Sequence, residues 1–317
     1  MKSPRMPALR TRRSFLQGAA ALAAASLSPV AFAQGARTRL VLLGTGGGPR
    51  VTAKGRAKPA TLIVANNIPY VIDCGDGVAL QLVRAGFGLD ALRYVFITHH
   101  HSDHNLDYGN LIYDAWAAGL RKPVDAYGPP PLAAMTDAWF QLNRFDIETR
   151  IADEGRVDLR KLVTAHEFAK DGQVMRNEDV RVTAARVRHP PIEHAYAYRF
   201  DCPDRSIVIS GDTTVSPELV ALAKGADVLV CEAMHLAGLE RLLAKVPNAA
   251  TLREHLLASH IVTEDLGKLA AEAGVKTLVM SHLVPGDDPS ITEAMWTEGV
   301  RKHYGGTIVV GRDLLEL

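Results

Sequence analysis

The chain has 317 residues with 36 basic and 35 acidic side chains, so its formal net charge at neutral pH is +1. The first 33 residues hold five of the basic side chains and none of the acidic ones, which leaves 284 residues with a net charge of −4. This balance excludes the basic field of a general nucleic-acid-binding protein, whereas the length suits one large α/β domain.

The N-terminal segment has the pattern of an export signal. Arg12 and Arg13 precede Ser-Phe-Leu, and an alanine-rich apolar stretch over residues 18–32 follows them. The stretch is too short for a stable membrane-spanning helix, and it ends in Ala-Phe-Ala, the small-x-small pattern of a signal peptidase site. The segment resembles a twin-arginine signal peptide, with an ordinary secretory signal or an N-terminal anchor as the alternatives.

This resemblance implies a periplasmic protein that the twin-arginine translocase exports in its folded state. Cleavage after Ala33 would remove residues 1–33 and leave residues 34–317 as the functional domain, with no permanent membrane anchor. No cysteine directly follows the cleavage site, so a lipid anchor is not expected.

Short apolar runs alternate with helical patterns in the first half of the chain. The apolar runs predict strands at residues 39–43, 61–64, 70–73, 94–97 and 124–127. Helical spacing predicts helices over residues 78–85 and 132–142. Residues 143–179 are charged and poorly periodic, and no element is predicted there.

The second half repeats this alternation. The predicted strands lie at residues 180–187, 195–200, 207–209, 228–231, 277–280 and 307–310. One predicted helix covers residues 263–273, with Thr263 as its N-cap and Gly274 as its stop, and another covers residues 291–303. Because no Gly/Ser-rich linker divides the halves, a single layered αββα domain is predicted.

A dense run of ligand-type side chains follows the predicted strand at residues 94–97. Residues 98–104 read Thr-His-His-His-Ser-Asp-His, which contains the spacing His-x-His-x-Asp-His. Imidazole nitrogen and carboxylate oxygen are the ligands that zinc-like ions prefer. A turn can direct His99 and His101 at one ion while Asp103 and His104 point to another. The run therefore predicts a metal site rather than a solvated polar turn.

Ligand-type residues also end four predicted strands of the second half. They are His189, Asp212, Glu232 and His282. A lone histidine in an apolar setting is more often a core residue, but the repetition of this pattern beside the histidine run favours a shared site. Because strand ends can share one edge of a sandwich, we expect these side chains to converge.

Taken together, the motifs resemble the metallo-β-lactamase superfamily, and within it the ribonuclease Z and arylsulfatase-like branch. In chain order they are Leu43-Gly44-Thr45-Gly46-Gly47-Gly48, Asp73-Cys74-Gly75, Thr98 to His104, Tyr127-Gly128-Pro129, His189, Gly211-Asp212-Thr213, Glu232-Ala233 and Ser281-His282. The His-x-His-x-Asp-His run is specific for the superfamily, whereas the Gly-Thr-Gly and Gly-Pro motifs only help to choose the branch. The resemblance implies a four-layer αββα sandwich, the metallo-β-lactamase fold.

The resemblance also implies a site for two divalent metal ions. In the family pattern, His99, His101 and His189 hold the first ion, Asp103, His104 and His282 hold the second, and Asp212 bridges both. Zinc is the default ion, although such sites also accept manganese or iron. Two ions about 3.5–4 Å apart can share a hydroxide and clamp the attacking and leaving oxygens of a displacement. His194 remains an alternative third ligand of the first ion.

A proton donor is implied beside the metals. The family places a histidine near His260, although His255 is close enough to make the match loose, and an acidic residue matching Glu232 orients it. A protonated imidazole suits a departing alkoxide or phenoxide, and the alternative is a surface histidine on a loop. The expected catalytic residues are therefore His260, Glu232 and Asp103, the last of which is also a metal ligand.

The leading functional hypothesis is an exported, metal-dependent hydrolase of phosphodiester or sulfate ester bonds in small molecules. A lactone or β-lactam hydrolase is the second hypothesis, although true β-lactamases of the superfamily lack a bridging carboxylate like Asp212. The third is tRNA 3′ processing by a ribonuclease Z, which the export signal, the negative charge and the short 190–211 interval oppose. A structural metal domain is the fourth, but structural zinc sites are usually closed and cysteine-rich.

Three further expectations concern the surroundings of the site. The pocket wall is expected from residues 50–58, 107–121 and 143–179. The three cysteines, Cys74, Cys202 and Cys231, are expected to be free thiols. A homodimer is expected from the resemblance alone.

Overall fold

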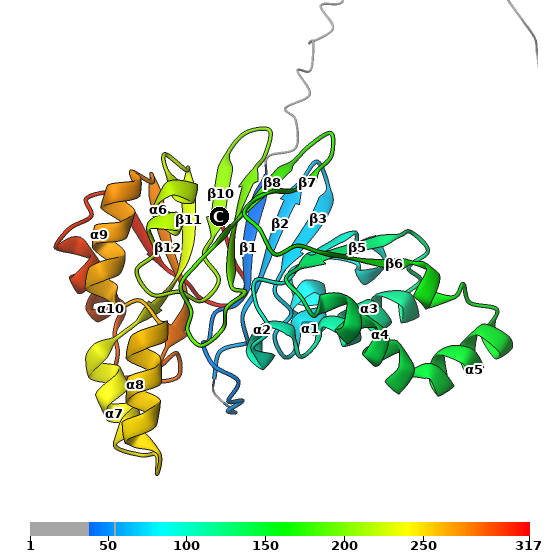
Figure 1. Ribbon diagram of the computed structural model, residues 1–317, viewed down its shortest axis with the longest axis horizontal. Helices are drawn as coiled ribbons and strands as arrows, with labels where there is room; N and C mark the ends of the chain where they lie inside the picture. The colour runs from blue at the N-terminus through cyan, green and yellow to red at the C-terminus, as the bar shows by residue number, and fades with distance from the viewer. Residues whose placement is uncertain (1–37, 54) are drawn as a thin grey trace, which may run out of the picture. The chain divides into compact units, whose positions relative to one another are not determined.

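Strands of the computed structural model, which describes residues 38–53 and 55–317, form two mixed sheets. The first has the order β14-β1-β2-β3-β4-β5-β6 and the second β13-β12-β11-β10-β9-β8-β7 (Figure 1). Their bounds are β1 Arg39–Gly44, β2 Ala60–Ala65, β3 Ile68–Ile72, β4 Tyr94–Phe96, β5 Val124–Gly128, β6 Val163–Glu167, β7 Gly172–Arg176, β8 Arg181–Arg186, β9 Tyr196–Asp201, β10 Ser206–Ile209, β11 Val228–Met234, β12 Thr277–Val284, β13 Thr307–Val310 and β14 Leu315–Glu316. The predicted signal peptide, residues 1–33, lies outside the described residues.

Helices cover the outer face of each sheet. They are α1 Val78–Arg84, α2 Ser102–Asn105, α3 Tyr108–Ala117, α4 Leu132–Leu142, α5 Arg144–Glu154, α6 Pro217–Ala223, α7 Leu236–Leu243, α8 Ala249–Ser259, α9 Thr263–Ala273 and α10 Glu293–Arg301, with 3₁₀ turns η1 Leu89–Ala91 and η2 Leu159–Lys161. The layer order is therefore helix, sheet, sheet, helix, as the sequence predicts. None of these helices is long and apolar enough to cross a membrane.

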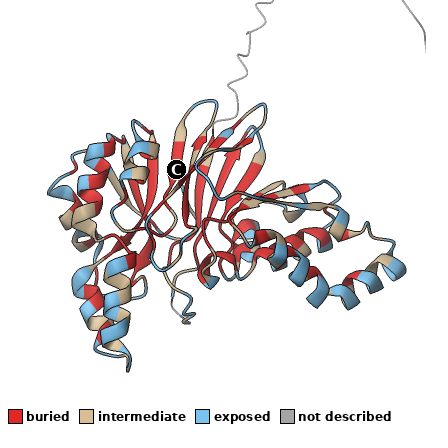
Figure 2. Cartoon of the chain, in the orientation of Figure 1, coloured by how far each residue is buried: buried red, intermediate tan, exposed pale blue. Residues whose placement is uncertain are grey.

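The period-two alternation of the strands produces this layering. In β1, Leu40 and Leu42 pack between the two sheets, whereas Val41 and Leu43 pack against the helices of the first sheet. A separate apolar cluster joins the second sheet to α6, α9 and α10. Figure 2 shows the consequence: the strands are buried along much of their length, while the helices keep exposed outer faces.

Parallel pairing brings strand ends to one edge. The strands β3 to β6 are parallel in the first sheet, and β10 to β13 are parallel in the second. β8 runs in the same direction as β10, because each pairs antiparallel with β9. The residues that follow β4, β8 and β10 therefore meet the carboxyl-terminal parts of β11 and β12.

Most predicted elements are confirmed, and the differences have physical reasons. β11 and β12 continue beyond residues 231 and 280, so Glu232 and His282 lie within strands rather than after them. The expected N-cap at Thr263 is wrong: Val262 precedes the first helical residue and Thr263 begins the helix. Gly274 does end α9, in the left-handed conformation with φ +63°.

Residues 143–179 contain elements that the sequence pattern missed. They form α5, η2, β6 and β7. α5 buries only Ile147 fully, so its apolar periodicity is weak. The sequence pattern also missed α8. Its apolar periodicity is weak, because Ser259 is its only fully buried residue. The cysteines are free thiols, as expected.

The aromatic contacts between the sheets give a first prediction. Phe96 is fully buried, with its ring centroid 5.0 Å from Tyr127, 5.4 Å from Tyr198 and 5.2 Å from Phe200. We expect Phe96→Ala to lower the free energy of unfolding by about 3–5 kcal/mol, because it leaves a cavity between packed layers. Urea titration followed by circular dichroism measures this loss. Phe145→Ala is the matched control, because its side chain is 84% exposed; similar losses in both variants would contradict the proposed packing role.

Candidate metal centre

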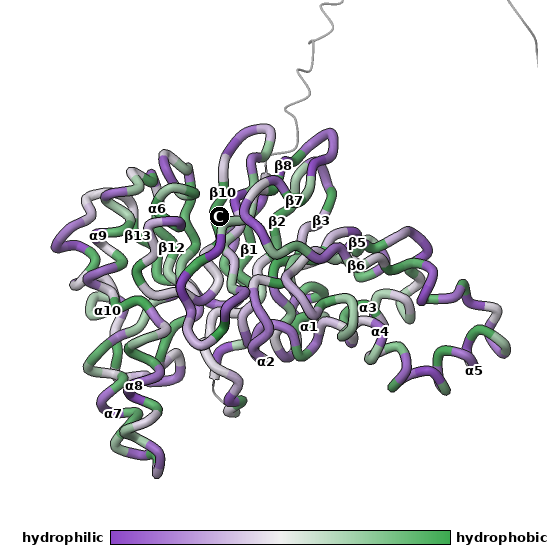
Figure 3. Tube along the Cα trace, in the orientation of Figure 1, coloured by the Kyte–Doolittle hydropathy of each residue, from purple (hydrophilic) through white to green (hydrophobic). Residues whose placement is uncertain are grey.

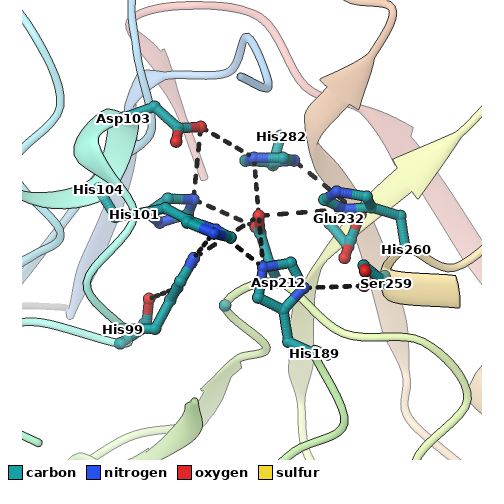
Figure 4. Close-up of polar contacts among 12 residues, drawn as sticks. His99, His101, Asp103, His104, His189, Asp212, Glu232, Ser259, His260 and His282 are labelled. Carbon is teal, nitrogen blue, oxygen red and sulfur yellow. Dashed lines mark hydrogen bonds and ion pairs between the residues drawn. The ribbon is translucent and has the colours of Figure 1, made fainter. Parts of the chain in front are cut away.

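The histidine run begins where β4 ends and continues into a short helix. Thr98 donates its backbone N–H to Asp73 Oδ1 at 2.8 Å, which fixes the first residue of the run. His101 has an extended backbone and precedes α2, so Asp103 and His104 lie on a helical turn. This change of backbone conformation turns the two halves of the run in different directions, as the sequence analysis expects (Figure 4).

The first group of potential ligands consists of His99, His101, His189 and Asp212, each with one ligand atom within 4.8 Å of the others. His101 Nδ1 lies 3.1 Å from His99 Nε2 and 3.0 Å from His189 Nε2. Asp212 Oδ2 lies 3.8 Å from Nε2 of both His99 and His189. Three imidazole nitrogens and a carboxylate oxygen thus converge, which is a suitable donor set for a divalent metal ion.

Asp103, His104 and His282 form the second group. His282 Nε2 lies 3.3 Å from Asp103 Oδ2, and His104 Nε2 lies 3.6 Å from that same oxygen. Asp212 faces this group as well, with Oδ1 3.2 Å from His104 Nε2 and Oδ2 3.2 Å from His282 Nε2. Its carboxylate therefore stands between the two groups (Figure 4), where the sequence analysis places the bridging ligand.

Unpartnered atoms at the centre fit bound cations. Among the described residues, His104 Nε2 and Asp212 Oδ1 are buried without a hydrogen-bond partner of acceptable geometry. Burying polar atoms without partners is costly. A metal ion would satisfy both atoms, so the residues present fit the group that the sequence implies.

Burial favours the neutral, metal-binding form of two imidazoles in the first group. Burial lowers the pKa of His99 well below its usual value and lowers the pKa of His189 to about 4. Neutral imidazoles offer the free lone pair that a metal needs. Burial also acts to lower the pKa of His104, but the carboxylates of Asp212, Asp73 and Asp103 raise it well above its usual value. Negative charge thus accumulates where a cation would neutralise it.

Hydrogen bonds from residues around the centre orient the ligand side chains. One of these residues, Asp73, has no role predicted from the sequence. Asp73 Oδ2 lies 2.8 Å from His104 Nδ1, which leaves Nε2 facing the centre. Ser259 O lies 2.9 Å from His189 Nδ1 and orients that ring in the same way. Gly48 donates its backbone N–H to Asp103 Oδ2 at 2.9 Å. Such contacts fix ring orientation and ligand basicity. Asp73 belongs to the Asp73-Cys74-Gly75 motif, but its contact with His104 becomes visible only in the folded chain.

The structure distinguishes the two candidate histidines of the 189–194 segment. His189 is 1% exposed and belongs to the first group. His194 instead lies beside Arg186, with its Nδ1 3.4 Å from a guanidinium nitrogen. His189 is thus the better placed of the two as a ligand.

Glu232 and His260 form a buried pair next to the centre. His260 Nδ1 lies 2.8 Å from Glu232 Oε2 and 4.0 Å from Asp212 Oδ2. Burial acts to lower the pKa of His260, but the Glu232 carboxylate and then Asp212 outweigh it and raise the pKa to about 9. The imidazole is therefore protonated at neutral pH. His260 is 7% exposed and lines the pocket, so it is not a surface histidine.

A cavity of about 440 Å³ opens onto the centre. The expected contribution of residues 50–58 is confirmed, since Arg50, Thr52, Gly55, Arg56 and Lys58 line it. The expectation for residues 107–121 and 143–179 is wrong, because the opposite wall comes from α7, α8 and the residues between them. Residues 108–117 form α3, whose Tyr108 and Trp116 are buried in the core beside the first sheet.

Comparison with known proteins agrees with this geometry. Residues 69–283 match the description "Beta-lactamase superfamily domain". The chain is 31% identical over 278 residues to a ribonuclease Z of Mycobacterium marinum, covering 87% of this chain and 96% of that protein. It is 33% identical over 277 residues to a ribonuclease Z of Mycobacterium sp. strain KMS, covering 87% and 94% respectively.

Solved structures share the fold at lower identity. The short form of human tRNase Z has a TM-score of 0.64 and 19% identity, covering 88% of this chain and 98% of that one. A diphosphatase from the PhnP family has a TM-score of 0.60 and 17% identity, covering 89% and 97%. At these identities the likeness shows the fold alone, and it agrees with the αββα layering.

Metal content tests the central position of Asp212. We expect the zinc-loaded protein to hold two zinc ions per chain and Asp212→Ala to hold fewer than two, because the variant removes the carboxylate shared by both groups. Inductively coupled plasma mass spectrometry after gel filtration measures this ratio. Circular dichroism should show the same secondary structure in both proteins. A folded Asp212→Ala variant that keeps two ions would contradict the bridging position.

Removing the Asp73 side chain should weaken metal binding without removing a ligand. We expect Asp73→Ala to lower zinc affinity about 10–100-fold, because His104 loses the partner of its Nδ1. Competition with a chromogenic chelator measures the affinity. Asp125→Ala is the control, since Asp125 pairs with Arg93 and His166 on the first sheet. Equal affinities in wild type and Asp73→Ala would disprove the orienting role.

Proposed function

Because the chain belongs to the metallo-β-lactamase superfamily of metal-dependent hydrolases, we propose that it hydrolyses phosphodiester bonds at a dinuclear metal centre. The observation that carries this proposal is the placement of Asp212 between two ligand groups, with the His260–Glu232 pair beside it. The ribonuclease Z name of the curated relatives supports a phosphodiester as the reacting group. Sulfate esters are the second ester class, since they present a similar tetrahedral, anionic centre.

The residues of this chain have separate tasks in the proposed reaction. When bound, the ions would lower the pKa of water and neutralise the charge of the phosphoryl oxygens. His260, held by Glu232 and protonated at neutral pH, donates its proton to the leaving oxygen. Asp103 binds metal in this scheme, and its bond from Gly48 N–H keeps it in place.

A buried cation supports an anionic substrate. Lys58 is 7% exposed, lines the pocket and donates from Nζ to the carbonyl oxygen of Arg50 at 2.5 Å. Burial lowers the pKa of its ammonium group, against the opposing effect of Asp103. Positive charge at the pocket wall attracts a phosphodiester to the centre.

tRNA 3′ processing is a second candidate, which the name of the curated relatives favours. Residues 190–211 contain β9 and β10 and leave no room for a long RNA-binding arm in that interval. We also propose export to the periplasm, on the strength of the residue 11–33 pattern alone. An exported protein would be separated from precursor RNA, so location helps to distinguish the two candidates.

A panel of substrates tests the reaction class. We expect kcat/KM of the zinc-loaded protein to be highest for an aryl phosphodiester, lower for an aryl sulfate, and near background for a cephalosporin and a precursor tRNA. The assay follows phenol release, ring opening or 3′ cleavage with equal enzyme. Preferential cleavage of the precursor tRNA would replace the proposal with tRNA processing, and turnover of the cephalosporin alone would refute both.

The proton donor gives a prediction that depends on the leaving group. We expect His260→Gln to lower kcat about 10²–10⁴-fold for a phenyl ester and much less for a 4-nitrophenyl ester, because the better leaving group needs no proton. Glu232→Gln should show the same trend. His166→Gln serves as the control, since His166 pairs with Asp125 on the first sheet. An equal loss for both esters would show that His260 is not the acid.

A further inference from the structure

Helices α7 and α8 lie side by side as a hairpin (Figure 1). Their apolar side chains form a small cluster, and several of them line the cavity. Leu239 and Leu243 of α7 are buried with Met234 and Val284 of the adjacent strands. Hydrophobic residues recur along both helices (Figure 3). The cluster anchors the hairpin to the second sheet, so its remaining apolar side chains are held in fixed positions.

Four of those side chains face the cavity rather than the cluster core. Leu242, Val246, Leu252 and Leu256 line the same cavity as Asp212 and His260. All four are partly exposed, and Val246, Leu252 and Leu256 also pack against the cluster. An apolar wall that faces an open cavity is typical of a ligand-binding surface.

The spacing along α8 connects this wall to the proton donor. Leu252 and Leu256 are four residues apart in α8, which places them along one side of the helix. His260 follows the last residue of α8 with an extended backbone, and its N–H donates to Leu256 O at 3.0 Å. Leu256 and His260 line the same cavity, so a group that receives a proton from His260 enters the space that Leu256 also lines.

Another part of the cavity lining is polar. It is built by the backbone of Gly46, Gly47 and Gly48 together with Arg50 and Lys58. A Cβ atom on Gly47 would lie 2.7 Å from His282 Cε1, so the glycine backbone lies directly against a ligand of the second group. The cavity thus has one side for an anionic centre and another for an apolar group.

We propose, building on the phosphodiesterase function above, that the α7–α8 hairpin binds the leaving group and selects apolar phenols or alcohols. In the reaction, the oxygen of one water forms a new bond to phosphorus, and the bond to the leaving oxygen breaks. The electron pair of that oxygen takes the proton of His260, and a proton from the attacking water restores the imidazolium. The organic part of the leaving group then extends along Leu256 and Leu252.

Two substrates with nearly the same chemical reactivity test this selection. Methyl phenyl phosphate and methyl 4-butylphenyl phosphate differ in apolar surface but hardly in leaving-group basicity. We expect kcat/KM to be about tenfold higher for the butylphenyl ester, because the butyl group leaves water on binding. Leu256→Gln should bring this ratio close to one. Leu236→Gln should leave it unchanged, because Leu236 is 47% exposed on the same hairpin and outside the cavity lining.

A binding measurement without hydrolysis tests the apolar leaving-group pocket independently of the phosphodiesterase reaction. Phenylphosphonate and 4-butylphenylphosphonate carry a carbon–phosphorus bond, so calorimetry measures their Kd without hydrolysis. We expect the butyl compound to bind about tenfold more tightly to the zinc-loaded wild type but not to Leu256→Gln. The same difference without turnover of either ester would refute the phosphodiesterase and keep the apolar pocket. Turnover with no chain-length preference, or a preference that survives in both Leu256→Gln and Leu252→Gln, would overturn the hairpin's role.

Discussion

The buried carboxylate of Asp212 is the constraint on which the arrangement of the whole centre depends. It is 2% exposed and lies within 4 Å of nitrogens from His99, His104, His189 and His282. A buried charge is tolerated only when opposite charge or hydrogen bonds compensate it. The surrounding imidazoles supply part of that compensation, and divalent cations would supply the remainder. The buried carboxylate and imidazoles thus form a preorganised set of ligands for metal ions.

The metal ligands come together because the parallel strands of both sheets end at one edge of the molecule. The first sheet contributes the run that follows β4, together with Asp73, and the second contributes His189, Asp212, Glu232 and His282. Packing between the sheets fixes the distance between these two sets, since Phe96 contacts Tyr198 and Phe200 directly before the histidine run begins. Rigid packing at this point holds the ligands in register, which a metal centre requires.

In the proposed reaction, chemistry and substrate choice come from different parts of the same cavity. The metal ligands and the His260–Glu232 pair are buried and preorganised, whereas the α7–α8 wall is partly exposed. The proposed small apolar ester thus depends on the α7–α8 wall, whereas the proposed hydrolysis depends on the buried centre.

The sequence by itself indicated most of the strands and helices and the metal-binding character of residues 99–104, because these follow from local periodicity and from closely spaced ligand-type residues. The αββα layering was expected from the family resemblance, and the strand order of each sheet comes from the structure. The sequence also indicated His189, Asp212 and His282, through their repeated place near strand ends. Only the tertiary structure places His189 in the first ligand group and His194 beside Arg186, and only it puts Asp73 behind His104. It also shows the distance of 2.8 Å between His260 and Glu232, a pair that the resemblance had implied. It also shows that α7 and α8, rather than residues 107–121 and 143–179, complete the pocket wall. Contacts between residues far apart in the chain depend on how the sheets and helices pack, and no local pattern in one sequence encodes those distances.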